Sequence, residues 1–100
     1  MNHSLTTIIK DKRENILAIG KNSYTKTHPY QAKCAKEVGL PEKVYLHAEI
    51  AAILSCNDLS KAHSIHIYRQ GKSGLWLNAK PCPICQSAID KTPIKKVFHT

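Results

Sequence analysis

The chain has 100 residues, 42% of them hydrophobic and 22% charged, so we expect it to bury one modest core as a single domain over residues 1–100. It has no apolar run near the roughly 18 residues of a membrane span and no secretory signal at its start, and four cysteines in so charged a chain do not suggest a disulfide scaffold. These exclusions favour a soluble protein in a reducing cytoplasm.

The basic balance of the chain points to an anionic partner. Fifteen Lys and Arg against seven Asp and Glu give a formal charge of +8, which favours nucleotides or nucleic acid. The lysines are scattered from Lys10 to Lys96 and form no basic run. A dedicated polyanion-binding face and an ordinary solvated surface therefore both stay open.

Two short apolar runs, residues 6–10 and 15–20, open the chain and are separated by four polar residues. Such runs joined by a polar turn are typical of a β-hairpin. A polar segment then leads to Pro29, which is favoured in the first turn of a helix. We expect that helix over residues 30–38, ending before Gly39.

Strands and helices alternate in the second half of the chain. A helix is predicted over residues 48–56, where Ile50, Ile53 and Leu54 form one apolar stripe that we expect to be buried. Extended runs follow at residues 65–69, 75–77 and 95–99, and a third short helix begins at Pro83, between the last two runs. This order predicts an α/β fold with a mixed sheet whose faces are covered by helices.

Cys82-Pro83-Ile84-Cys85 places two thiols three residues apart, on one side of a helical turn. At a helix start the free N–H groups and the helix dipole favour thiolate, which is the form that binds zinc. A Cys-x-x-Cys pair alone also fits a redox dithiol or half of a structural zinc site.

His47-Ala48-Glu49 lies where the second predicted helix begins. Taken alone, His47 fits a helix cap or a packed core residue, and Glu49 fits a first-turn acid that the helix dipole stabilises. Together with Pro81 and the two cysteines, however, they reproduce H-x-E followed by P-C-x-x-C, the signature of zinc-dependent deaminases. The chain thus resembles the cytidine and deoxycytidylate deaminase superfamily.

The resemblance implies a three-layer α/β/α cytidine deaminase-like sandwich with a mixed sheet of about four to five strands. It implies that His47, Cys82 and Cys85 hold Zn²⁺ and leave the fourth position to a water whose pKa falls toward about 7. Glu49 is the candidate for moving protons to the ring nitrogen and the departing ammonia. In a regular helix two residues two positions apart diverge by about 200°, so His47 and Glu49 converge only if the helix is just beginning there.

Four further residues are candidates for substrate binding. The resemblance implies that Asn22 contacts the sugar or base, and Ala48 lies inside the motif itself. His28, in the same loop as Asn22, is a candidate for a phosphate contact. Trp76 is a candidate for stacking on a base, and its alternative role is to cover an edge of the core.

The end of the sequence departs from the family pattern, since many members continue past the last strand and this one stops at Thr100. We therefore expect an open pocket or one completed by a homo-oligomer. Ile50 directly after His47-Ala48-Glu49 resembles the motif of the tRNA adenosine deaminases. Lys80 departs from that motif, because those enzymes usually have glutamate before the Pro-Cys pair. We rank a free cytidine, deoxycytidine or dCMP type of substrate first, a base in single-stranded DNA or RNA second, and a non-catalytic zinc-stabilised binding module third.

Overall fold

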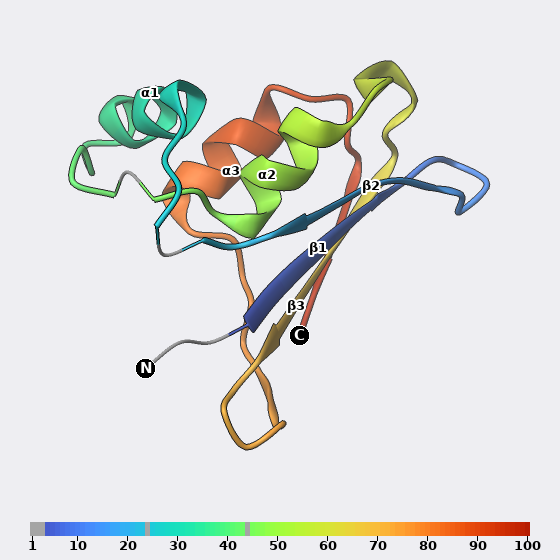
Figure 1. Cartoon of the computed structure of the whole chain (residues 1–100). Coiled ribbons are helices and arrows are strands. Elements are labelled where there is room, and N and C mark those ends of the chain that lie inside the picture. The colour runs from blue at the N-terminus through green and yellow to red at the C-terminus, as the bar shows by residue number, and fades with distance from the viewer. Residues whose placement is uncertain (1–3, 24, 44) are drawn as a thin grey trace.

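The computed structural model describes residues 4–23, 25–43 and 45–100, which form one sheet and the helices packed against it (Figure 1). The strands are β1 (Ser4–Lys10), β2 (Ile16–Lys21), β3 (Ser64–Gln70), β4 (Trp76–Leu77) and β5 (Lys96–His99). The helices are α1 (Pro29–Glu37), α2 (Ala48–Ser55) and α3 (Pro83–Asp90), with a short 3₁₀ helix at Leu59–Lys61 that the sequence patterns did not predict. The predicted elements are confirmed, with ends that differ by one or two residues.

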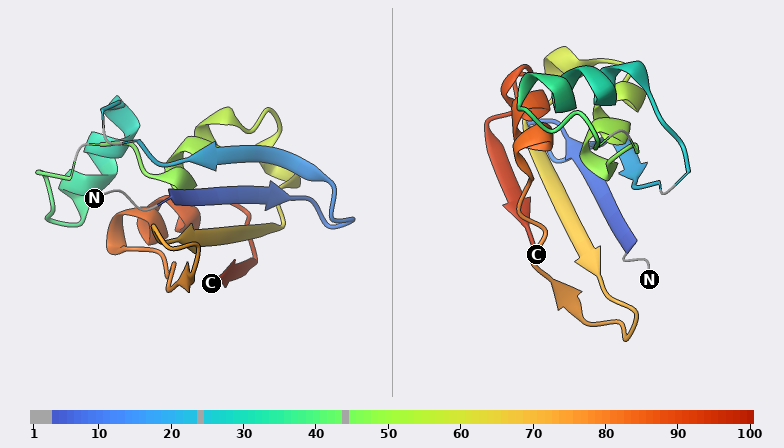
Figure 2. Two further views of the ribbon diagram at one scale, coloured as in Figure 1. Left: turned by 60° about the horizontal axis from the view of Figure 1, so that its bottom comes forward. Right: turned by 90° about the vertical axis from the view of Figure 1, so that its left-hand side faces the viewer.

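The sheet is mixed, as expected, and β3 lies at its centre. On one side β3 pairs antiparallel with β1, which in turn pairs antiparallel with β2. On its other side β3 pairs in parallel with β5 along its first half and antiparallel with β4 at its end. In Figure 2 the strands β5, β3, β1 and β2 lie in that order. The parallel pair requires a crossover, and α3 lies within it.

All three helices lie on the same side of the sheet (Figure 1). Helix α2 packs against β1 and β2 at very short range, because Gly20 in β2 has no side chain. A Cβ atom at Gly20 would collide with the backbone of Ala48 and Ala52 in α2. The glycine therefore sets how closely the start of α2 approaches the sheet.

The core lies between this face of the sheet and the helices. Ile9, Ile65 and Ile67 come from the strands, and Ile50 and Ile84 come from the helices, and each is at most 1% exposed. One core expectation is wrong. Leu54 is 41% exposed, because the buried residues of α2, from Ala48 to Ile53, cover one arc of about 200° around the helix, and Leu54 lies about 40° beyond the edge of that arc.

The other face of the sheet carries no helix of the described part of the chain. Ile19, Ile8, His66 and Phe98 are register partners in a row across β2, β1, β3 and β5. The rings of His66 and Phe98 stack with centroids 4.9 Å apart, and Phe98 is 50% exposed. The expected α/β fold is thus confirmed, and the described residues supply two of the three expected layers.

None of the helices in residues 4–23, 25–43 and 45–100 has the length and apolar character needed to cross a membrane.

Candidate metal centre

Two helix starts meet beside the sheet and bring together the residues of the two sequence motifs. His47 is the N-cap of α2 and Cys82 is the N-cap of α3, both with extended backbone. Neither side chain caps its own helix within the described chain, so both are directed to the shared site. Cys85 follows one turn into α3 and is fully buried.

The donor atoms of these three residues are arranged as a metal would need them. The Nδ1 atom of His47 lies 3.2 Å from the Sγ atom of Cys85 and 3.5 Å from the Sγ atom of Cys82, and all three donors lie within 4.8 Å of one another. Zinc bonds of about 2.0–2.1 Å to nitrogen and 2.3 Å to sulfur, at a tetrahedral angle, separate N and S by roughly 3.5 Å. The donor set therefore fits zinc in both chemistry and spacing.

Glu49 joins this cluster from the first turn of α2. His47 precedes the helix with an extended backbone (φ −82°, ψ 153°), and so the 200° divergence of a regular helix does not apply to the pair. The Glu49 side chain is 4% exposed and interacts with the thiol of Cys85 and with His47. Burial raises the pKa of its carboxyl group above the ordinary value.

The titratable groups of this cluster differ in how strongly each holds its proton. A hydrogen bond from Cys85, together with His47, lowers the pKa of the Cys82 thiol to about 4. The same contact with Cys82, reinforced by burial, raises the pKa of Cys85, and the hydrogen bond with Cys82 raises that of His47. Cys82 is thus a thiolate that two neighbours stabilise, and a bound cation would replace their protons.

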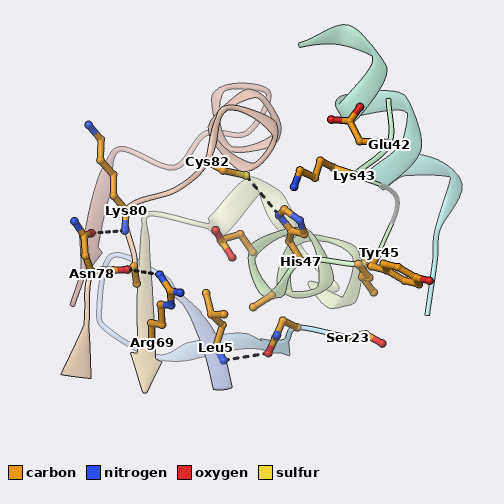
Figure 3. Close-up of a pocket in the computed structure, with 15 residues that line it drawn as sticks. Leu5, Ser23, Glu42, Lys43, Tyr45, His47, Arg69, Asn78, Lys80 and Cys82 are labelled. Carbon is orange, nitrogen blue, oxygen red and sulfur yellow. Dashed lines mark hydrogen bonds between the residues drawn. The ribbon is translucent and has the colours of Figure 1, made fainter. Parts of the chain in front are cut away.

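A pocket with a volume of about 500 Å³ opens above this cluster. Figure 3 shows His47 and Cys82 between two walls, with Lys43 and Tyr45 on one side and Arg69, Asn78 and Lys80 on the other. The described lining also includes Leu5, Asn22, Ser23, Glu42, Leu46, Ala48, Glu49 and Ala79. The pocket thus has acid–base and metal-binding groups at its base and cationic side chains in both walls.

Two of the four substrate-binding candidates, Asn22 and Ala48, line the pocket. Asn22 follows β2 and is held against the start of β1. Its Oδ1 accepts from the backbone N–H of Leu5 at 3.0 Å, and its own N–H donates to the Leu5 carbonyl at 3.3 Å. These bonds fix the position of Asn22 at the edge of the pocket.

His28 and Trp76 are absent from the described lining. His28 is the N-cap of α1, and its Nδ1 accepts from the N–H of Tyr30 at 3.0 Å. Trp76 is 62% exposed in β4, where its ring lies 6.1 Å from that of Tyr68. The register with Gln70 places the Trp76 side chain toward the open face of the sheet.

Sequence reasoning missed several pocket residues, among them Lys43, Tyr45, Arg69 and Asn78. Lys43 and Tyr45 come just before His47, so their place in the chain already indicated closeness to the ligands. Arg69 and Asn78 carried no such signal, because only the pairing of β3 with β4 brings them together. There Arg69 Nη1 donates to the Asn78 carbonyl at 3.3 Å.

Comparison with known proteins agrees with this geometry. A search of curated proteins finds no match to the chain. The family model described as the cytidine and deoxycytidylate deaminase zinc-binding region matches residues 1–100. With His47, Cys82 and Cys85 positioned to hold a metal ion, the chain belongs to this zinc-binding deaminase family.

Proposed function

We propose that this protein is an enzyme that deaminates the cytosine base of a free nucleoside or nucleotide, of the cytidine, deoxycytidine or dCMP type, by hydrolysis. One observation carries the proposal. The buried carboxyl group of Glu49 lies beside the His47, Cys82 and Cys85 donor set at the base of a pocket of about 500 Å³. A pocket of this size accommodates a small ligand.

In this reaction water adds to the ring carbon that bears the amino group, the C–N bond breaks, and ammonia leaves. Zinc held by His47, Cys82 and Cys85 would supply a water whose pKa is lowered toward about 7. Glu49 takes one proton from the attacking water and delivers it to the ring nitrogen. It then moves the remaining proton of the added hydroxyl group to the amine, so that the carbonyl forms and ammonia leaves as the C–N bond breaks. Its burial beside His47 and the thiol of Cys85 supports this role.

Asn22 and Ala48 are the proposed contacts to the base or sugar, and their place in the pocket supports this assignment. Beyond them, three cationic residues, Lys43, Arg69 and Lys80, line the pocket together with two acids, Glu42 and Glu49. This excess of cations favours a substrate that carries phosphate over an uncharged nucleoside.

A second candidate is a base within single-stranded DNA or RNA. The formal charge of +8 and the cations in both walls of the pocket favour it, since a strand presents phosphates on both sides of the reacting base. The positive charge is compatible with a strand and with a free nucleotide. The two substrates are distinguished by identifying the product of the reaction.

The test is a mass-spectrometric screen of the zinc-loaded protein with cytidine, deoxycytidine, dCMP, dCTP, adenosine and short single strands. We expect uracil compounds and ammonia from the free cytosine compounds, with dCMP turned over faster than deoxycytidine. Uracil formed only within a strand would replace the first proposal with the second. A zinc-loaded protein that deaminates none of these compounds would refute both and leave a zinc-stabilised binding module.

A further inference from the structure

One buried polar side chain lies outside the metal cluster and still contacts it. Gln31 in α1 is 0% exposed, although α1 contributes no metal donor to the cluster and no residue to the described pocket lining. A buried primary amide is costly unless its N–H and C=O groups find partners. Its partners therefore indicate why this position carries glutamine.

Gln31 uses both halves of its amide on the segment that leads into α2. Its Nε2 donates to the carbonyl of Lys43 at 3.2 Å, and its Oε1 accepts from the backbone N–H of His47 at 3.2 Å. One side chain thus holds both ends of a segment that contributes Tyr45 and Leu46 to the pocket.

The bond to His47 matters because His47 is an N-cap residue. Its N–H precedes the helix and has no carbonyl partner within α2, so the helix itself does not fix the direction in which this residue leaves the turn. The amide oxygen of Gln31 supplies that partner. It thereby constrains the backbone from which the His47 imidazole reaches the two sulfur atoms.

Helix α1 is also tied to the helix that carries the cysteines. It packs against α3, and Lys91 Nζ lies 2.7 Å from Glu37 Oε1 between the end of α3 and the end of α1. Gln31 therefore connects α1, which is attached to the helix of the two cysteines, with the backbone of His47.

We propose that Gln31 is a positioning residue that aligns His47 with Cys82 and Cys85 and sets the pocket wall that precedes His47. The proposal rests on the zinc site of the proposed function, and it does not depend on which compound is the substrate. Partners that hydrogen-bond the side chain of a metal ligand typically change metal affinity or activity by about 10–100-fold, and we expect an effect at the lower end of that range for Gln31, which bonds the backbone N–H of His47.

The test compares Gln31→Met, which keeps the length of the side chain and removes both hydrogen bonds, with Gln86→Met as a matched control. The Gln86 side chain is exposed on α3 and bonds only to Asp90 in the described contacts. The first readout is amide hydrogen exchange at His47 in the metal-free protein. We expect exchange at least roughly tenfold faster in Gln31→Met and unchanged in the control.

The second readout is Co²⁺ bound in place of Zn²⁺, because its visible spectrum reports the geometry of the ligands without any turnover. Gln31→Met is expected to shift the Co²⁺ bands and to weaken Co²⁺ binding about tenfold or more. Native exchange at His47 together with a native Co²⁺ spectrum and affinity would overturn the proposal, whatever the substrate screen finds.

Gln31→Glu provides a second variant if Gln31→Met does not fold. It keeps an oxygen that accepts from His47 and replaces the donor to Lys43. The His47 amide is therefore expected to stay protected, while KM rises several-fold, to about 3–10 times its native value, with little change in kcat. An unchanged KM would refute the role in the pocket wall, and loss of protection at His47 would refute the assignment of the two bonds.

Discussion

The base and the walls of the pocket are built in different ways. At the base, the side chains of His47, Cys82 and Cys85 project from the starts of α2 and α3. The neighbouring Glu49 is buried. The walls consist largely of exposed side chains on loops and strand ends, such as Lys43 and Lys80.

In the proposed enzyme this difference would separate the residues of the chemical step from the residues that select the substrate. A proton shuttle and a metal site require atoms held within a few tenths of an ångström, which packed helix starts provide. Exposed loops tolerate substitution, so the side chains of the walls can change substrate preference without disturbing the reacting groups. The changes below test that division.

The largest effect is expected from Cys85→Ser at the base. A hydroxyl group is a poor zinc ligand, so we expect loss of bound zinc and of detectable deamination, measured by metal analysis and ammonia release. Cys34→Ser is the matched control, because Cys34 is equally buried but lies in α1 outside the donor set. If Cys85→Ser retained one zinc per chain, the proposed ligand set would be wrong.

Glu49→Gln should keep the metal and remove the proposed proton shuttle. We expect kcat to fall by about 10²–10⁴-fold with the zinc content unchanged. Glu14→Gln serves as the control, since it removes an exposed carboxylate between β1 and β2 and should leave kcat near native. A Glu49→Gln enzyme with native kcat would assign the proton transfers to another group.

Gly20→Ala tests whether the base depends on the close approach of α2 to the sheet. The added methyl group would collide with backbone atoms of α2, so we expect a loss of about 1–3 kcal/mol in the free energy of unfolding. Denaturant unfolding measures it. Gly71→Ala is the control, because its nearest neighbour is the flexible Leu77 side chain at 3.1 Å. Equal losses in the two variants would contradict this role of Gly20.

The smallest effect is expected in the walls. Lys43→Gln should raise KM for a phosphorylated substrate about fivefold, since one charge pair at 4 Å in water is worth about 1 kcal/mol. The effect should shrink as salt is added, and KM for the unphosphorylated nucleoside should not change. Lys33→Gln on the exposed side of α1 is the control. A fall in kcat instead would place Lys43 in the chemistry and weaken the division between base and walls.

Short-range patterns were enough to predict most of the secondary structure and the donor set. Pro29 and Pro83 each lie in the first turn of a helix, and the motif His47-Ala48-Glu49 marks the start of α2. These positions were predictable because the preference of a residue for a helix start depends on its neighbours within a few residues. The burial of Leu54 was predicted wrongly, since periodicity gives an apolar stripe but not the direction from which the sheet approaches it.

The order of residues along the chain already indicates which chemistry is available: two thiols, an imidazole and a carboxyl group at helix starts, in the order typical of zinc deaminases. The fold was needed to show that His47 precedes its helix, and so lies on the same side as Glu49, and that Arg69 meets Asn78 at the pocket. It also decided that Trp76 turns toward the open face, because the pairing register of a strand fixes the face of every side chain. These decisions depend on contacts between residues far apart in the chain, which no local pattern encodes.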